Sequence, residues 1–273
     1  MTHRVCISSA LAPAPAPASA HVPASAAPKP TPDQIKAVIF DMDGLMFDTE
    51  RLVYKIYLEA AQKFGFSFTP EIFYYLAGRS SESIIQVLQH MYGPAHNARS
   101  WREWVIARRV EKLTQIDYRV DIKPGLRDLI SALQRHQIPY CIASSSRREA
   151  IERYLKATDL ADDFTRIISV DDVSHAKPDP EIFLKAAECL HAEPSSVLVL
   201  EDSMNGLRAA QAGGLIAGFV YDDLSDLPSV VHGFPADTSC LSLGYPSLWD
   251  YSRALADISF TSLTEVERYL CAR

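Results

Sequence analysis

The segment at residues 35–44, IKAVIFDMDG, joins a short apolar run to two aspartates and a glycine. An unbroken apolar run of this length is typical of a strand that is covered on both faces, as in a parallel sheet. Asp41 and Asp43 then lie just beyond the carboxyl end of that strand, at the edge of an open α/β sheet where ligands bind. The segment therefore predicts both the fold class and the place of a functional site.

Five further apolar runs of the same kind follow, with helical patterns between them. They are IPYCIA at 138–143, RIISV at 166–170, SVLVL at 196–200, LIAGFVY at 215–221 and ADISF at 256–260. Strands that alternate with helices in this way predict an α/β fold with a doubly wound parallel sheet.

The alternation breaks between residues 45 and 137, where no strand signal occurs. Four stretches in this interval have helical patterns, and two of them follow a Thr or Ser that can act as an N-cap. A loop of this length inside a compact domain would be unusual. We therefore expect an inserted α-helical domain at 50–122 and a core domain made of 34–49 and 123–273.

The two ends of the chain have different compositions. Residues 10–32 are dominated by alanine, proline and serine, so we expect 1–33 to be a disordered arm. The arm lacks the apolar core of a secretory signal, because prolines interrupt each of its apolar runs. No acidic residue precedes Asp33, so an organelle transit peptide remains an alternative. Turn-forming residues without a steady period predict an irregular insertion at 222–255, followed by a last strand and a helix at 263–270.

The composition is that of an ordinary globular protein, with 48% hydrophobic and 22% charged residues. A formal net charge of -7 argues against a nucleic-acid-binding surface, and no apolar stretch is long enough for a membrane span. The five cysteines fit no metal-binding spacing and indicate unpaired thiols in a reducing compartment, so we expect a cytoplasmic protein. The sequence leaves the oligomeric state open.

Polar side chains follow the predicted strands where their carboxyl ends share one edge. Asp41 and Asp43 follow the first run, Ser144 the second, and the Glu201–Asp202 pair the fourth, while Lys177 lies in a nearby loop. Four carboxylates in one crevice repel one another unless a cation offsets their charge. Oxygen ligands favour Mg²⁺, and a lysine with a hydroxyl suits a phosphate. The set predicts phosphoryl-transfer chemistry.

Four motifs, FDMDG, SSS, AKPDP and VLEDSMNGLRAAQAGG, resemble those of haloacid dehalogenase superfamily phosphatases in order and spacing. The resemblance covers about residues 35–221 and implies a Rossmann-like core whose helical insertion is a type-one cap. Within that superfamily, the sequence is similar to the β-phosphoglucomutase-like and small-metabolite phosphatase group. It implies that the chain is a phosphoric monoester hydrolase that forms a phosphoaspartate.

The resemblance also assigns roles to residues. Asp41 is implied as the nucleophile and Asp43 as the general acid and base. Mg²⁺ would be held by Asp41, the backbone carbonyl of Asp43 and Asp202, with Glu201 acting through water or from outside the ligand shell. These assignments make the carboxylate crevice a catalytic magnesium site.

The phosphate and the rest of the substrate are assigned to other side chains. Ser144 and Lys177 would bind the phosphate, with Ser145 as a further candidate, whereas Ser146 is expected to cap the next helix. Arg79 would face the site from the cap and bind the leaving group, or else form a surface salt bridge.

The substrate class remains broad at this stage. A small phosphorylated metabolite is expected, of the sugar phosphate, polyol phosphate or nucleoside monophosphate type. A β-phosphoglucomutase-like mutase is the first alternative, but Val53, Ala77 and Ser81 stand where such mutases carry a histidine, a lysine and an arginine. The second alternative is a catalytically idle relative that binds a phosphometabolite, or a partner protein through the proline-rich arm.

Overall fold

The computed structural model describes residues 28–272 except for 223, 225, 232–235 and 242–246. Its six strands form one sheet in the order β3-β2-β1-β4-β5-β6, and every neighbouring pair is parallel. The strands are β1 (Ala37–Phe40), β2 (Tyr140–Ala143), β3 (Ile167–Ile168), β4 (Val197–Glu201), β5 (Ile216–Val220) and β6 (Ile258–Phe260). All six predicted strands are present, and the α/β fold is confirmed.

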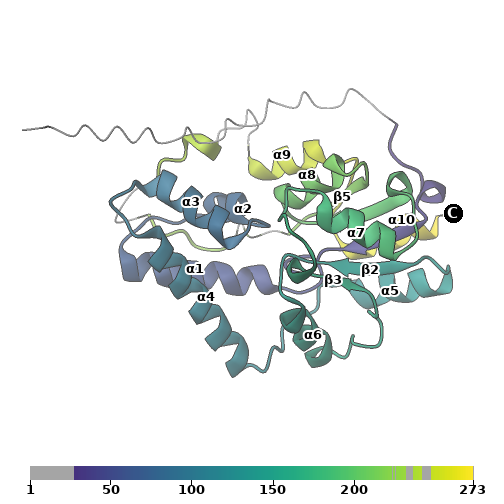
Figure 1. Ribbon diagram of the computed structural model, residues 1–273, viewed down its shortest axis with the longest axis horizontal. Helices are drawn as coiled ribbons and strands as arrows, with labels where there is room; N and C mark the ends of the chain where they lie inside the picture. The colour runs from purple at the N-terminus through teal and green to yellow at the C-terminus, as the bar shows by residue number, and fades with distance from the viewer. Residues whose placement is uncertain (1–27, 223, 225, 232–235, 242–246, 273) are drawn as a thin grey trace, which may run out of the picture.

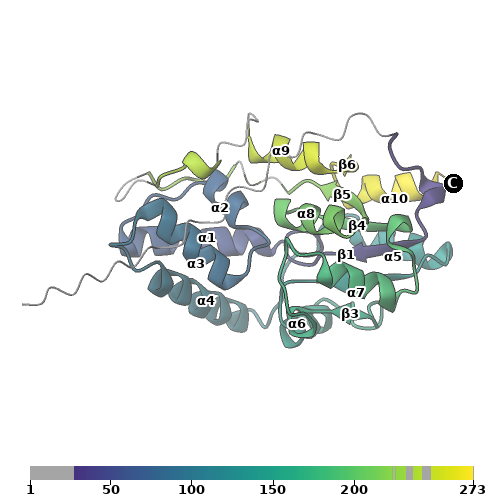
Figure 2. The ribbon, with the colours of Figure 1, turned by 45° about the horizontal axis from the view of Figure 1, so that its top comes forward.

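Helices cover both faces of the sheet, as Figures 1 and 2 show. Side chains alternate along β1, so Val38 and Phe40 pack on one face and Ala37 and Ile39 on the other. The first face is covered by α5 (Leu126–Arg135), α6 (Arg148–Ala157) and α10 (Leu263–Cys271). The second face is covered by α7 (Glu181–Cys189), α8 (Met204–Ala212) and α9 (Leu248–Leu255). The sheet is therefore doubly wound, as predicted.

The strand order reverses between β1 and β4, which are neighbours in the sheet although Leu200, the partner of Phe40, lies 160 positions further along the chain. Their carboxyl ends carry Asp41 and Glu201. Such a reversal opens a crevice beyond the carboxyl ends of the strands, and ligands bind there.

Four helices form a second packed unit beside the sheet, at the left of Figure 1. They are α1 (Thr49–Phe64), α2 (Pro70–Leu76), α3 (Ser81–Tyr92) and α4 (Ala98–Gln115), and they enclose a hydrophobic cluster of their own. The side chains of Thr69 and Ser80 accept backbone hydrogen bonds at the starts of α2 and α3, as predicted. The division at residues 49–50 and 122–123 stays a prediction.

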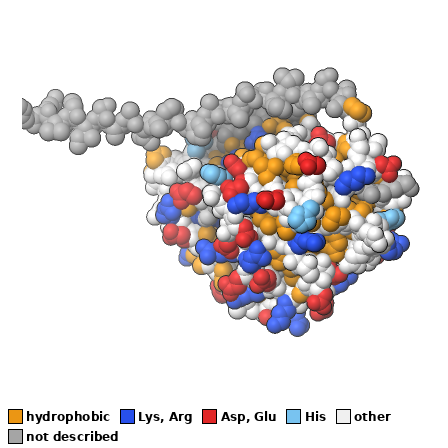
Figure 3. Space-filling model, turned by 45° about the vertical axis from the view of Figure 1, so that its right-hand side comes forward, with side chains coloured by type: hydrophobic (Ala, Val, Ile, Leu, Met, Phe, Trp, Pro, Cys, Tyr) orange, Lys and Arg blue, Asp and Glu red, His pale blue; other side chains and the backbone are white. Residues whose placement is uncertain are grey.

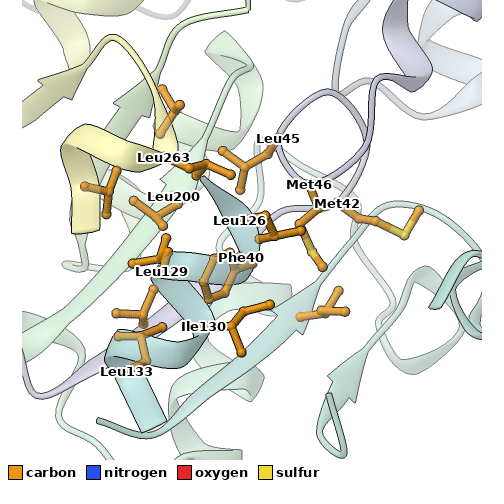
Figure 4. Close-up of a cluster of buried hydrophobic side chains, with 14 of the residues drawn as sticks. Phe40, Met42, Leu45, Met46, Leu126, Leu129, Ile130, Leu133, Leu200 and Leu263 are labelled. Carbon is orange, nitrogen blue, oxygen red and sulfur yellow. The ribbon is translucent and has the colours of Figure 1, made fainter. Parts of the chain in front are cut away.

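A tight loop after Asp41 connects the sheet to α1. Gly44 has a φ of +82°, and its amide donates to the carbonyl of Phe47 at 3.0 Å and to the hydroxyl of Thr49 at 3.2 Å. Leu45 and Met46 point into the core beside Leu126 and Leu263, as Figure 4 shows. This packing fixes the start of the loop on the core, close to the crevice.

The segment after β5 differs from its prediction in two ways. It contains α9, where an irregular insertion was expected, because neighbouring turn-formers conceal an eight-residue helix that Ser247 caps. In addition, Val230 forms an antiparallel bridge with Phe68, and Leu224 packs in the hydrophobic cluster of α1–α4. The prediction of an irregular segment at 222–255 is therefore wrong for α9, and part of this segment packs on the helical unit.

The predicted arm lies largely outside the described residues. Its last residues form a short 3₁₀ helix at Pro32–Gln34, and the hydroxyl of Tyr269 donates to the carbonyl of Pro30.

Within the described part of the chain no helix is long and apolar enough to cross a membrane. Figure 3 shows that acidic and basic side chains are interspersed on the sheet side of the molecule rather than gathered into one basic patch.

Candidate active site

Lys177 lies between two carboxylates at the carboxyl edge of the sheet. Its ammonium nitrogen is 2.6 Å from Asp41 Oδ1 and 2.6 Å from Glu201 Oε1, and it reaches the carbonyl of Ala143 at 3.4 Å. Asp41, Lys177 and Glu201 are all buried. The fold thus brings together residues that follow β1, β3 and β4, as the sequence predicts.

Burial sets the electrostatics of this group. It raises the pKa of Asp41 to about 7, against the opposing effect of the Lys177 charge, and Glu201 raises that pKa further. Burial, followed by the charges of Glu201 and Asp41, raises the pKa of Asp202 well above its usual value. For Lys177, burial opposes the charged form, but the two neighbouring carboxylates raise its pKa on balance. The lysine is therefore a fixed positive charge in a crevice with an excess of acid.

The oxygens of Asp41, Glu201 and Asp202 lie within 4.8 Å of one another. Both oxygens of Glu201 already accept hydrogen bonds. Oε1 accepts from Lys177, and Oε2 accepts from the amide and hydroxyl of Ser203 at 3.0 and 2.9 Å. Among the described residues, the carboxylate of Asp202 has no hydrogen-bond or ion-pair partner. Closely spaced acidic oxygens suit a hard divalent cation such as Mg²⁺, and the raised pKa values of Asp41 and Asp202 show that these two carboxylates lack sufficient compensating positive charge. The residues therefore fit the predicted metal, with Glu201 in a supporting place.

Two glycines make room for this arrangement. A Cβ atom on Gly206 in α8 would lie 1.8 Å from Glu201 Oε1, and one on Gly44 would lie 2.0 Å from Asp202 Oδ2. Since real Cβ atoms do not approach so closely, any side chain there would displace a carboxylate. The motif glycines are thus part of the site.

Asp43 is held from two directions. The hydroxyl of Ser146 donates to Asp43 Oδ2 at 2.6 Å, and the guanidinium of Arg109 on α4 donates to Asp43 Oδ1 at 2.7 Å. The expectation that Ser146 caps the next helix is wrong, because Arg147 occupies the N-cap position of α6 and makes no side-chain cap. The short hydrogen bond from the Ser146 hydroxyl to the Asp43 carboxylate is charge-assisted, and it is therefore stronger than a hydrogen bond to a backbone amide at the start of α6.

The predicted phosphate-binding serines differ in their surroundings. Ser144 is 1% exposed, its hydroxyl accepts from the amide of Ser146 at 3.1 Å, and its own amide donates to the carbonyl of Ile168 at 3.0 Å. Ser145 is half-buried next to it. Both stand at the end of β2, one strand away from Asp41, and their phosphate role stays a prediction.

The helical unit reaches the crevice through a loop and a helix start. The side-chain amide of Asn205 donates to the carbonyl of Ala77 at 2.8 Å, and a Cβ atom on Gly78 would lie 2.5 Å from Ser203 Oγ. Burial and the charge of Asp43 raise the pKa of Glu50, at the start of α1, to about 8. These contacts place α1–α4 over the carboxyl edge of the sheet.

Arg79 contacts two residues of the helical unit. Its guanidinium lies 4.5 Å from the ring centre of Tyr75, and it donates to the Tyr75 carbonyl at 2.9 Å and to Ser83 Oγ at 3.2 Å. Its expected role with the leaving group stays a prediction.

The sequence did not single out Arg109, Glu50 or Asn205 as site residues. A helix-face analysis offers one signal, because Arg109 follows the buried Trp101 and Val105 on one side of α4.

A model of the haloacid dehalogenase-like hydrolase family matches residues 38–220 of the chain. The chain is 30% identical over 182 residues to a phosphorylated carbohydrates phosphatase of Thermotoga maritima, covering 66% of this chain and 82% of that protein. It is 33% identical over 198 residues to a probable pseudouridine-5'-phosphatase of Drosophila melanogaster, covering 69% and 83%.

A solved structure supports the same fold. The β-phosphoglucomutase of Clostridium difficile superposes with a TM-score of 0.62 at 22% identity, covering 87% of this chain and 98% of that chain. At this identity the likeness shows the fold alone. Both curated relatives described above are named as phosphatases, whereas another, 28% identical over 191 residues, is the β-phosphoglucomutase of Bacillus subtilis.

Proposed function

Because the chain belongs to the haloacid dehalogenase-like hydrolase family, as a phosphoric monoester hydrolase, we propose that it hydrolyses a phosphorylated carbohydrate or a similar small ester through Asp41. The observation that carries this proposal is the pairing of Lys177 with both Asp41 and Glu201 at 2.6 Å. The pairing holds a buried carboxylate ready at the crevice.

Asp41 suits the role of nucleophile. Its backbone amide donates to the carbonyl of Leu200 at 3.0 Å, and Lys177 holds Oδ1, so the side chain is fixed by both its main chain and its head group. A fixed carboxylate can attack phosphorus in line with the leaving oxygen, which is the positioning that phosphoryl transfer requires. Ser144, Ser145 and Lys177 would surround the phosphate oxygens.

Asp43 suits the role of general acid and base. Two residues away from Asp41, it can protonate the leaving oxygen and then take a proton from the water that releases the phosphate. Ser146 fixes one of its oxygens, while Arg109 reaches the other from α4. We infer that α1–α4, residues 50–122, act as a cap over the core formed by 34–49 and 123–273, and that closure excludes bulk water.

Asp41, Asp202 and the backbone carbonyl of Asp43 would hold Mg²⁺, with Glu201 supporting them. When bound, the ion would neutralise charge on the phosphate and on the acidic cluster. Glu201 orients Lys177 and Ser203, and so keeps the crevice in shape.

Hydrolysis is favoured over a mutase reaction by the environment of Val53. This residue is 9% exposed and packs in the hydrophobic cluster of the cap, so its position offers no titratable group to the crevice. An idle relative is disfavoured, because Asp41, Asp43 and Lys177 form an intact set of buried or partly buried contacts.

The test is phosphate release from a panel of sugar, polyol and nucleoside monophosphates, with Mg²⁺ and with a chelator. Asp41→Asn should abolish release, and the exposed Asp162→Asn serves as the matched control that keeps it. Chelation should abolish release in both active proteins. Full activity in Asp41→Asn would falsify the nucleophile assignment, and interconversion of sugar phosphates without phosphate release would favour the mutase.

A further inference from the structure

Two arginines lie on the same face of α4, the cap helix that touches Asp43. Arg102 and Arg109 are seven residues apart, which returns a side chain to nearly the same side of a helix. Glu50 and Tyr57 have the same spacing on α1, and α1 packs against α4. Arg102 donates to the hydroxyl of Tyr57 at 3.0 Å, which ties the two faces together.

Arg102 differs from its neighbours on α4 in its partners. It donates only to hydroxyls, to Tyr57 and to Ser81 Oγ at 3.2 Å, and no described carboxylate lies within ion-pair distance of it. By contrast, Arg99 pairs with Glu82, and Arg108 pairs with two glutamates. A guanidinium with neutral partners keeps an uncompensated charge, and its planar array of donors suits a carboxylate or phosphate.

Arg109 pairs with Asp43, which under the proposed function must also contact the substrate. Its side chain is 30% exposed and that of Asp43 is 20% exposed, so the pair can be reached from the crevice. Under the proposed function, Asp43 must turn to the leaving oxygen of the substrate. A partly buried guanidinium that loses its carboxylate needs another anion or strong acceptor.

We propose that Arg102 and Arg109 form a subsite for the leaving group, and that the substrate carries a second anionic group at its far end. The inference rests on the proposed function and names its substrate class: a phosphorylated carbohydrate that also bears a carboxylate or a second phosphate. Seven residues of helix span about 10 Å, so Arg102 lies about that far along α4 from Arg109 and Asp43, a separation that suits a pentose- or hexose-sized leaving group. The hydroxyls of Tyr57 and Ser81 hold Arg102 in place.

The experiment compares substrates with matched carbon chains. Sorbitol 6-phosphate has a neutral leaving group, 6-phosphogluconate has a carboxylate, and glucose 1,6-bisphosphate has a second phosphate. For each substrate, kcat and KM are measured for the wild type and for Arg102→Gln, Arg102→Lys and Arg109→Gln. Arg99→Gln, on the same helix but paired with Glu82, is the control.

The wild type should favour at least one anionic substrate over sorbitol 6-phosphate by about 10- to 100-fold in kcat/KM, the range expected of one charge-assisted hydrogen bond. Arg102→Gln should remove most of this preference through KM, Arg102→Lys should restore part of it, and Arg109→Gln should also reduce it. Arg99→Gln should keep it. The anionic substrate that is preferred identifies the distal group as carboxylate or phosphate.

A wild type that treats the three substrates alike would overturn the subsite, as would an Arg102→Gln variant with an unchanged preference. Hydrolysis of p-nitrophenyl phosphate by the wild type and by Asp41→Asn is measured as well. It tests the proposed phosphatase function separately from the arginine subsite. Asp41-dependent hydrolysis of that ester without any preference overturns the subsite alone. Absence of all Asp41-dependent hydrolysis overturns the proposed function.

Discussion

Ser146 and Asp43 are 103 residues apart in the chain, and the hydroxyl of the first donates to the carboxylate of the second at 2.6 Å. The bond joins the loop after β2 to the loop after β1, across the crevice where the phosphate is expected. It fixes the direction in which Asp43 presents its other oxygen. Under the proposed function, Ser146 is thus a positioning residue for Asp43.

Ser146→Ala should lower kcat by about 10- to 100-fold, because a hydrogen bond to a charged group is worth roughly 1.5–3 kcal/mol. The loss should be larger for an alkyl phosphate than for p-nitrophenyl phosphate, since a good leaving group needs less proton donation. Steady-state kinetics on both esters check this. Ser131→Ala, which removes an exposed helix serine, should change neither, and an equal loss on both esters would argue against a role through Asp43.

Lys177 supports the structure as well as the proposed chemistry. Lys177→Met should abolish activity and lower the free energy of unfolding by about 3–5 kcal/mol, because two buried carboxylates lose their shared cation. Urea unfolding with and without Mg²⁺ measures this. The second substitution Glu201→Gln should recover part of the stability, whereas Lys185→Met, which removes a lysine whose side chain is 43% exposed, should cost little. A stable Lys177→Met protein would mean that the carboxylates are already neutral.

Gly206 offers a test in which two effects have opposite signs. A glycine inside a helix is normally about 1 kcal/mol less favourable than alanine, so Gly→Ala in α8 should stabilise the protein on propensity alone. The Cβ atom would, however, lie 1.8 Å from Glu201 Oε1. We expect Gly206→Ala to lower both the melting temperature and kcat, as measured by thermal unfolding and phosphate release. A rise in melting temperature with full activity would contradict the close packing of Glu201.

The sheet and the carboxylate crevice could be predicted because both depend on local patterns. Each strand is a short apolar run, and β1 and β4 end in acidic residues, so the parallel topology alone brings Asp41 and Glu201 together. Lys177 was placed by its motif. Asp41 and Glu201 lie at or directly after the end of a strand, whereas Lys177 lies nine positions beyond β3, where the motif and not the strand identifies it.

The remaining contacts depend on how the α1–α4 unit packs on the sheet domain, and no local sequence pattern predicts that packing. Arg109 reaches Asp43 from the middle of a helix, and Asn205 reaches the carbonyl of Ala77 across the crevice. Ser146 was assigned to a cap because serines before helices usually cap them, but a nearby carboxylate competed successfully for its hydroxyl. The helix α9 was missed because turn-formers precede it and only eight residues show its period.

Asp172 provides a prediction about pH that is independent of the active site. The hydroxyl of Ser169, the Ser169 amide and Arg148 all donate to its carboxylate, and the hydrogen bonds from Ser169 are the main cause that lowers its pKa below 3.8. A carboxyl group whose pKa is lower in the folded state stabilises the protein fully above its unfolded pKa. That contribution disappears as the pH falls from about 4 through the folded pKa.

Asp172→Asn should therefore destabilise the protein near neutral pH and flatten the acid limb of its stability curve, so that the two proteins converge as the pH falls through the folded pKa of Asp172. Urea unfolding from pH 7 to pH 3 gives the comparison. Asp162→Asn, an exposed aspartate, should follow the wild-type curve throughout. Parallel curves for Asp172→Asn and the wild type would mean that the Ser169 hydrogen bonds do not depend on the charge of Asp172, because a protonated carboxyl would then hold them equally well.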